Sequence, residues 1–281
     1  MPSATIPWRG PGGERPELPL PPGPMPLRSA GQLRKRWRYI GLFAEELMLC
    51  VARVQIGPLS QSFWVVWDRR ERRPAAHTAL RPGSREVRMD GARIEIEARD
   101  LRASLELGEA EPIESICPSP GGGGWGWTRK RAGMPVAGTV ELGGRRIEVN
   151  GRGVDDESAG YHQRHTSWRW SAGVGEGADG HQLAWNLVEG VNDPAEHSER
   201  AIWLDGVPHE PAPVRFDGVA AIDFTAGQRL EFASESAHAR DDNYLLIRSR
   251  YRHNFGTFSG SLDGTELTNG LGVMEEHDAV W

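Results

Sequence analysis

The sequence contains only two cysteines, Cys50 and Cys117, among its 281 residues. Two thiols cannot build the disulfide framework of a small secreted protein or an all-cysteine, four-ligand metal site. No apolar run approaches the roughly 20 residues that cross a bilayer as a helix. The first residues, MPSATIPWRGPGG, also lack the charged region followed by an apolar region that is typical of secretory signals. We therefore expect a cytoplasmic protein without an integral membrane segment.

Lysine is scarce as well. Of the 33 lysines and arginines only Lys35 and Lys130 are lysines. This bias is typical of a GC-rich genome, although arginine forks also hold carboxylates and phosphates. The formal net charge of −6 argues against a general nucleic-acid binder. Tryptophan is abundant, with 11 residues beside 4 tyrosines, and such numbers indicate cores, barrel interiors or ligand pockets.

Proline is concentrated at the start of the chain. Residues 1–30 hold nine of the 20 prolines, and PELPLPPGPMP cannot form a helix or a central strand, because proline fixes φ and lacks an N–H donor. We therefore expect an extended arm with polyproline character. Its apolar residues Trp8 and Leu20 favour a strap that packs on the body of the protein, and the alternative is a disordered leader.

From Trp37 onward the pattern is that of β-strands. ARIEIEARD and LRASLELG alternate apolar and polar residues with period two, whereas SFWVVWD is apolar enough to be buried on both faces. No segment shows a 3.6-residue repeat over four turns. The sequence therefore predicts an all-β fold. Turn pairs that favour positive φ separate successive strands at Asp90-Gly91, Gly143-Gly144, Asp205-Gly206 and Asp263-Gly264.

A long strand is expected near the C-terminus, in NYLLIRSRYRHNF. Tyr251 and His253 would share one of its faces, and Arg248, Arg250 and Arg252 the other. A solvated outer face is the favoured interpretation of the arginines. If they pointed inward, they would bind an anionic head group.

The length of the strand-forming region indicates two units. One eight-stranded barrel needs roughly 120–150 residues, so about 250 structured residues suit two sheets or barrels packed together. The glycine-rich segment 121–133 is the natural junction between them. We therefore divide the chain into a Pro-rich arm (1–30), an N-terminal β domain (31–120) and a C-terminal β domain (121–281).

Several segments rich in Trp, Gly and His resemble a known bacterial family. They are GWGWTRKRAGMPVAG (124–138), DESAGYHQRHTSWRWSAGVG (156–175), WNLVEGVND (185–193) and GVMEEHDAVW (272–281). The family is the one called domain of unknown function 2804, and the resemblance spans residues 33–281.

A more distant resemblance is to the lipocalin-like proteins that include hydroxyneurosporene synthase and tocopherol cyclase. The segment Tyr161–Trp170 is similar in composition to a strand of that group that contains Tyr, Asp, His and Trp. The resemblance implies paired lipocalin-like β-barrels. We therefore predict two packed lipocalin-like antiparallel β-barrels, or strongly curved sheets, with the N-terminal Pro-rich arm.

If Tyr161–Trp170 forms one strand, then His162, Arg164, Trp168 and Trp170 share a face. The two histidines of the HQRH segment would point to opposite faces, so we expect no metal site. A face that combines tryptophans with a histidine would make a ligand pocket containing an acid or a base. A packed core with a hydrogen-bonded histidine is the alternative.

Carboxyl groups near these aromatic residues are the candidate acids. Asp156 leads into the His/Trp segment, and neighbouring carboxylates raise one another's pKa, although a solvated turn is the alternative. Glu275 and His277 share a face of the last segment, where a carboxylate can orient a histidine or exchange a proton with it. An exposed chain end is the alternative there. The candidate catalytic residues are His162, Asp156, Glu275 and His277.

Asn186 interrupts an apolar strand, and a buried amide needs hydrogen-bond partners. It would orient a ligand or a histidine, or pair with neighbouring backbone. The candidate ligand-binding residues are Tyr161, Arg164, Trp168, Trp170, Trp185, Asn186 and Trp127.

Three functions fit these patterns. The first is binding of a hydrophobic small molecule, a lipid or an isoprenoid, in a Trp-rich barrel cavity. The alternative is a cofactor-free hydratase, isomerase or cyclase, in which a carboxyl or His protonates an alkene and tryptophans stabilise the cation. The second alternative is a carbohydrate-binding or carbohydrate-active β protein. The interior of the second barrel should discriminate among them, and the sequence determines neither the ligand nor the oligomeric state.

Overall fold

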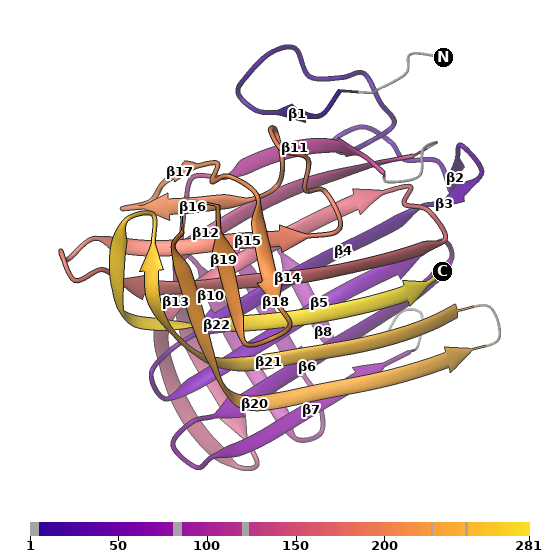
Figure 1. Cartoon of the computed structure of the whole chain (residues 1–281). Coiled ribbons are helices and arrows are strands. Elements are labelled where there is room, and N and C mark those ends of the chain that lie inside the picture. The colour runs from indigo at the N-terminus through magenta and orange to yellow at the C-terminus, as the bar shows by residue number, and fades with distance from the viewer. Residues whose placement is uncertain (1–5, 81–85, 120–123, 226, 245–246) are drawn as a thin grey trace.

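The computed structural model describes residues 6–80, 86–119, 124–225, 227–244 and 247–281. These residues contain strands, turns and loops but no helix, so none of them offers a helix that could cross a membrane. Two large antiparallel sheets pack face to face, the second (orange to yellow) in front of the first (indigo to pink) in Figure 1. The predicted all-β fold with two packed, strongly curved sheets is confirmed.

The first sheet has the order β7-β6-β5-β4-β13-β12-β10-β9-β8, with β11 joined to β12 and β1 joined to β11. Its strands are β1 (Trp8–Arg9), β4 (Lys35–Phe43), β5 (Leu47–Ile56), β6 (Leu59–Asp68), β7 (Arg73–Ala79), β8 (Val87–Asp90), β9 (Arg93–Glu97), β10 (Leu101–Leu107), β11 (Ile113–Pro118), β12 (Trp125–Leu142) and β13 (Arg145–Gly160).

The second sheet has the order β17-β16-β15-β14-β22-β21-β20-β19-β18, and β2 and β3 form a separate short hairpin. The strands are β2 (Arg28–Ser29), β3 (Gln32–Leu33), β14 (His165–Glu176), β15 (Gln182–Glu189), β16 (Ala201–Leu204), β17 (Val207–His209), β18 (Val214–Asp217), β19 (Ala221–Phe224), β20 (Arg229–Tyr244), β21 (Ile247–Leu262) and β22 (Thr265–Val280).

Three of the four turn pairs predicted from the sequence join antiparallel strands, whereas Asp90 pairs with Arg93 as the last residue of β8 and the turn that follows it is Gly91-Ala92. Asp205 and Gly206 have φ values of 48° and 85°, and Asp263 and Gly264 have values of 54° and 83°. Positive φ at both central positions gives a turn whose twist matches that of the strands it joins. The short connections hold each hairpin in the register that its alternating pattern requires.

Three apolar cores explain why some strands are buried on both faces. On β6, Trp64 and Val66 point into a core that the first sheet encloses, whereas Val65 and Trp67 point into a core shared by the two sheets. The second sheet encloses the third core. The expected double burial of SFWVVWD is thus confirmed. β9 contributes to the first core alone, which is why ARIEIEARD alternates apolar and polar residues.

Residues 6–30 of the Pro-rich arm form an ordered strap, which crosses the top of the first sheet in Figure 1. β1 pairs with β11. Leu20, only 1% exposed, packs in a small fourth core with Tyr161, and Trp8 packs against that core. Arg9 donates from Nη1 to the backbone carbonyl of Ser198 at 2.5 Å. The strap therefore contacts both sheets.

The chain passes from the first sheet to the second between Gly160 and His165. β12 and β13 form a long hairpin that pairs with β10 and β4, so residues up to Gly160 belong to the first sheet. The single strand predicted for Tyr161–Trp170 is wrong, because residues 161–164 cross between the sheets and a local alternation does not reveal such a crossing. The domain division at residue 121 stays a prediction, and residues 121–123 lie outside the described residues.

Candidate functional site

A cavity of about 340 Å³ lies between the two sheets. β4–β7, β12 and β13 form one wall, and β14, β15 and β20–β22 form the other. The cavity does not lie inside the second barrel, where the sequence interpretation placed it. That interior is filled by aromatic packing, in which the rings of Phe258 lie 4.9 Å from Trp185 and 4.7 Å from Phe232.

On the first sheet, one row of neighbouring residues crosses six strands along the cavity wall. Residues directly opposite each other in an antiparallel ladder point to the same face. The charged end of the row lies on β12 and β13, and its apolar part lies on β4–β6. The row consists of Lys130, Asp156, Tyr39, Ala52, Phe63 and Thr78.

The second sheet presents two such rows to the first. One runs through Val188, Trp170, Glu275, His253 and His238, and the next runs through Trp168, His277, Tyr251 and Arg240. The walls meet where the hydroxyl of Tyr39 lies 3.1 Å from Nε2 of His253. The rings of Phe63 and Tyr251 form a second contact, with centroids 5.9 Å apart.

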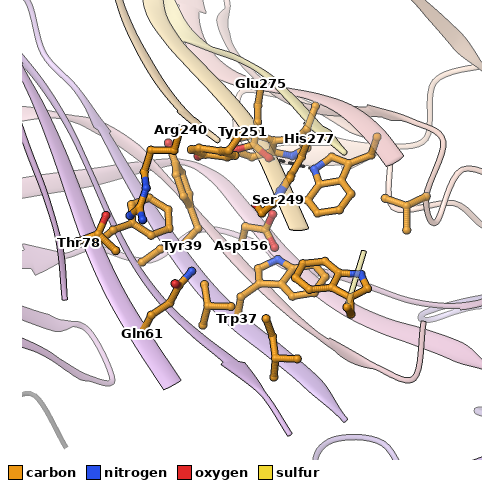
Figure 2. A pocket seen from close by; sticks show the side chains of 18 of the residues that line it. Trp37, Tyr39, Gln61, Thr78, Asp156, Arg240, Ser249, Tyr251, Glu275 and His277 are labelled. Carbon is orange, nitrogen blue, oxygen red and sulfur yellow. Dashed lines mark hydrogen bonds between the residues drawn. The ribbon is translucent and has the colours of Figure 1, made fainter. Parts of the chain in front are cut away.

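Glu275 is a carboxyl group in a largely apolar environment. Both of its oxygens accept hydrogen bonds, Oε2 from the hydroxyl of Tyr251 at 2.8 Å and Oε1 from Nε1 of Trp168 at 2.9 Å. Burial raises the pKa of Glu275 to about 7, although these two bonds favour the charged form. Glu275 therefore exchanges a proton near neutral pH, and Figure 2 shows it beside Tyr251 and His277.

A buried ion cluster also lines the cavity. Nζ of Lys130 is 2.5 Å from Oδ1 of Asp156 and 3.4 Å from Oε1 of Glu199. Burial lowers the pKa of Lys130, but the two carboxylates outweigh this effect and raise it overall, so the ammonium is charged. Asn192 donates to Oε2 of Glu199 at 2.9 Å. Among the described residues, no group of three or more His, Cys, Asp or Glu is arranged to hold a metal ion.

His277 and the tryptophans complete the lining. Oγ of Ser249 and Nε2 of His277 share a hydrogen bond of 2.8 Å, and burial lowers the pKa of His277 to about 4. The imidazole is therefore neutral at pH 7. The indole planes of Trp37 and Trp168 are parallel within 2°, and the ring centroids of Trp168 and Trp281 lie 6.4 Å apart. These rings give the cavity wide π surfaces.

The cavity brings together part of the predicted site. Asp156, Trp168, Trp170, Glu275 and His277 all line it. Asp156 lies on the first sheet and the other four residues lie on the second. The sequence alone does not place them together, because the crossing between the sheets separates them. Their roles stay predictions.

His162 and Arg164 lie outside the cavity lining. The ring of His162 packs 5.7 Å from that of Trp37, and its carbonyl accepts a hydrogen bond of 2.7 Å from Nζ of Lys35. Neither ring nitrogen has a partner among the described residues. Burial, together with the charge of Lys35, lowers the pKa of His162 to about 3. Arg164 is exposed.

The remaining predicted residues pack in other parts of the molecule. Tyr161 and Trp127 belong to the core beneath the arm, and Trp185 belongs to the core of the second sheet. Asn186 accepts a hydrogen bond of 2.8 Å from Nε1 of Trp170. It therefore orients an indole of the cavity wall.

Sequence reasoning missed several lining residues, among them Trp37, Lys130, Glu199 and Tyr251. One signal for Lys130 was available. Both lysines of this arginine-rich chain are only 2% exposed, and a compact ammonium differs from a guanidinium in shape and hydrogen bonding. No comparable signal marks Glu199, because the cation that pairs with it, Lys130, lies on β12, far away in the sequence.

Comparisons with known proteins agree with the fold. One similar solved structure is that of a candidate AttH protein of Nitrosomonas europaea, with 13% identity, a TM-score of 0.54 and coverage of 86% of this chain and 92% of that one. Another is kievitone hydratase of Nectria haematococca, with 8% identity, a TM-score of 0.53 and coverage of 86% and 88%. At these identities the likeness shows a shared fold. No curated protein matches the sequence.

The family resemblance noted in the sequence is confirmed by a match to the sequence model of that family. The match covers residues 76–281, which includes both ends of the cavity but not the strands before β7. This chain therefore belongs to the family described as domain of unknown function 2804.

Proposed function

We propose that this protein is a cofactor-free enzyme that adds water to, or shifts, a carbon–carbon double bond of a mainly apolar small molecule. The observation that carries the proposal is Glu275. This carboxyl has a pKa of about 7, is held by two donors and lines an apolar cavity. A proton donor with a pKa near the working pH is what general acid catalysis requires.

The reaction begins with proton transfer from Glu275 to one carbon of the double bond. The π electrons form the new C–H bond, the neighbouring carbon becomes cationic and Glu275 becomes a carboxylate. The indole faces of Trp37 and Trp168 stabilise the cation. The donors Tyr251 and Trp168 stabilise the carboxylate as its charge develops.

Asp156 serves as the base that completes the reaction. In hydration, a water oxygen bonds to the cationic carbon and passes one proton to Asp156. In isomerisation, Asp156 takes a proton from an adjacent carbon, and the electrons of that C–H bond form the new double bond. Lys130 and Ser158 both contact Oδ1, so Oδ2 makes no hydrogen bond to a described residue and is available to the cavity. Return of the proton to Glu275 through solvent restores the enzyme.

The shared fold adds support to this reaction class. Kievitone hydratase, by its name, is a hydratase, so a protein of this fold performs the kind of chemistry that we propose here. A lipid or an isoprenoid with an isolated double bond remains the substrate class that we favour, because most of the cavity wall is apolar.

Infrared spectroscopy tests the proton donor directly. The carbonyl stretch of a protonated carboxyl should disappear with a midpoint near pH 7 in the wild type and be absent from Glu275→Gln. Glu276→Gln is the matched control, because Glu276 lies next in the chain and bonds Arg169 at 3.2 Å. Incubation of unsaturated fatty acids and isoprenoid alcohols in D2O should then label substrate carbon. A wild-type protein without a Glu275 band near pH 7 would disprove the proposal.

A further inference from the structure

The cavity opens between two edge strands. β7 is the last strand of the first sheet, and among the described residues β19 pairs with β20 only at Arg229–Glu231. The later part of β20 is therefore an edge, and it lines the cavity together with β7. The deep end lies opposite, where the side chains of Lys130 and Glu199 are 2% and 4% exposed.

The rim of this opening is apolar. Leu59 and Leu80 line the cavity and are 55% and 49% exposed, although large hydrophobic side chains are otherwise rarely exposed in the described part of the chain. Exposed leucines around a cavity form a surface on which an apolar ligand can bind. Val54, Ile56 and Phe63 continue this apolar surface inward along β5 and β6.

Arg240 lies at the same opening. Phe63 and Tyr251 touch across the sheets, and their neighbours on the edge strands are Thr78 and Arg240. Figure 2 shows Arg240 beside Thr78, with Gln61 below them. These side chains supply hydrogen-bond donors beside the apolar wall that β5 and β6 form.

The guanidinium of Arg240 retains donors for a ligand. Its Nη2 bonds Oδ1 of Asp242 at 2.8 Å, which is its one hydrogen bond to the described residues. The side chain is 24% exposed. A guanidinium has five N–H donors in a planar fork that matches a carboxylate. The other cation of the lining, Lys130, is already paired with two carboxylates.

We propose that the natural ligand is amphipathic, with a carboxylate that binds Arg240, Thr78 and Gln61 and an apolar body that follows β5 and β6 inward. That the double bond in the apolar body is the group that reacts rests on the proposed function. Arg240 on β20 and Glu275 on β22 are separated by one intervening strand, so their backbones lie roughly 10 Å apart. The reacting double bond therefore lies several bonds from the carboxylate.

Calorimetry with three probes of equal chain length tests this inference. Dodecanoate should bind the wild type at least about tenfold more tightly than dodecanol or dodecylamine, since a hydrogen bond to a charged group contributes that much. Arg240→Gln should remove the preference and leave the affinity for dodecanol unchanged. Arg250→Gln is the control, because Arg250 lies on the outer face of β21 and is 81% exposed.

A second variant covers a failure of Arg240→Gln to fold. Arg240→Lys keeps the charge, so it should still prefer dodecanoate to dodecylamine. Three results would overturn the inference. The wild type could bind dodecanoate and dodecanol equally, the preference for dodecanoate could survive in Arg240→Gln, or no probe could bind. The infrared titration of Glu275 is read without ligand. If no carboxyl band titrates near pH 7, the proposed function is disproved and the preference for a carboxylate ligand is unaffected. If calorimetry shows no such preference, the inference is disproved and the infrared result for Glu275 is unaffected.

Discussion

Two buried histidines should make the protein sensitive to acid. Burial lowers the pKa of both His162 and His253 to about 3, with Lys35 adding to the effect at His162 and His238 at His253. In the unfolded chain a histidine has a pKa near 6.5. Between these values the unfolded state binds a proton that the folded state does not. Stability therefore falls as the pH drops from about 6.5 toward 3.

The size of the effect follows from linkage. Each histidine should lower the free energy of unfolding by about 1.4 kcal/mol per pH unit within this window. His162→Phe removes the contribution of one histidine and also removes two ring nitrogens without partners. Relative to the wild type, this variant should gain about 2 kcal/mol between pH 6.5 and 4.5, because the unfolded histidine is half protonated at pH 6.5.

Urea unfolding followed by tryptophan fluorescence at pH 7.5, 6.5, 5.5 and 4.5 measures these free energies. Thr166→Val is the control, because Thr166 is buried and does not titrate. That variant should shift the stability by the same amount at each pH. If His162→Phe instead ran parallel to the wild type from pH 6.5 to 4.5, His162 would not be the neutral buried group that we describe.

Three further predictions concern stability. Leu20→Ala should cost about 2–5 kcal/mol by leaving a cavity under the arm, and a fall in melting temperature that is too small to measure would contradict the strap. Lys130→Met should cost about 3–5 kcal/mol at pH 7, measured by urea unfolding, because Asp156 and a second buried carboxylate lose their cation; an unchanged midpoint would refute the ion cluster. Trp170→Phe should cost about 1–3 kcal/mol in the same assay by leaving Asn186 without its donor, whereas a neutral result would mean that water replaces the indole.

The strand elements could be predicted because their signals are local. Period-two alternation identifies one-sided strands, continuous apolar runs identify two-sided strands, and Asp-Gly pairs identify tight hairpins. The position of the cavity is not local. It depends on which face of β5 and β6 meets the second sheet, and both faces are apolar.

For the candidate site as well, local signals could be read from the sequence and non-local ones could not. Asp156 could be found because it leads into the His/Trp segment, and Glu275 because it shares a face of the last segment with His277. Tyr251 and Arg240 could not, since each lies in a strand rich in charged residues. Only the pairing of β20, β21 and β22 brings them to the face that carries Glu275.

The residues that line the cavity come from two stretches of the chain, one before the segment that matches the family and one within it. The groups proposed to move protons, Asp156 and Glu275, lie within the segment that matches the family, residues 76–281. The apolar wall of Trp37, Val54 and Phe63 lies before that segment. The proton-transfer pair is thus encoded on the matched stretch alone, whereas the apolar lining is shared between both stretches, because Trp168, Trp170 and Val188 also line the cavity. Substitutions within residues 1–75 therefore reshape one wall of the cavity and leave Asp156 and Glu275 unchanged.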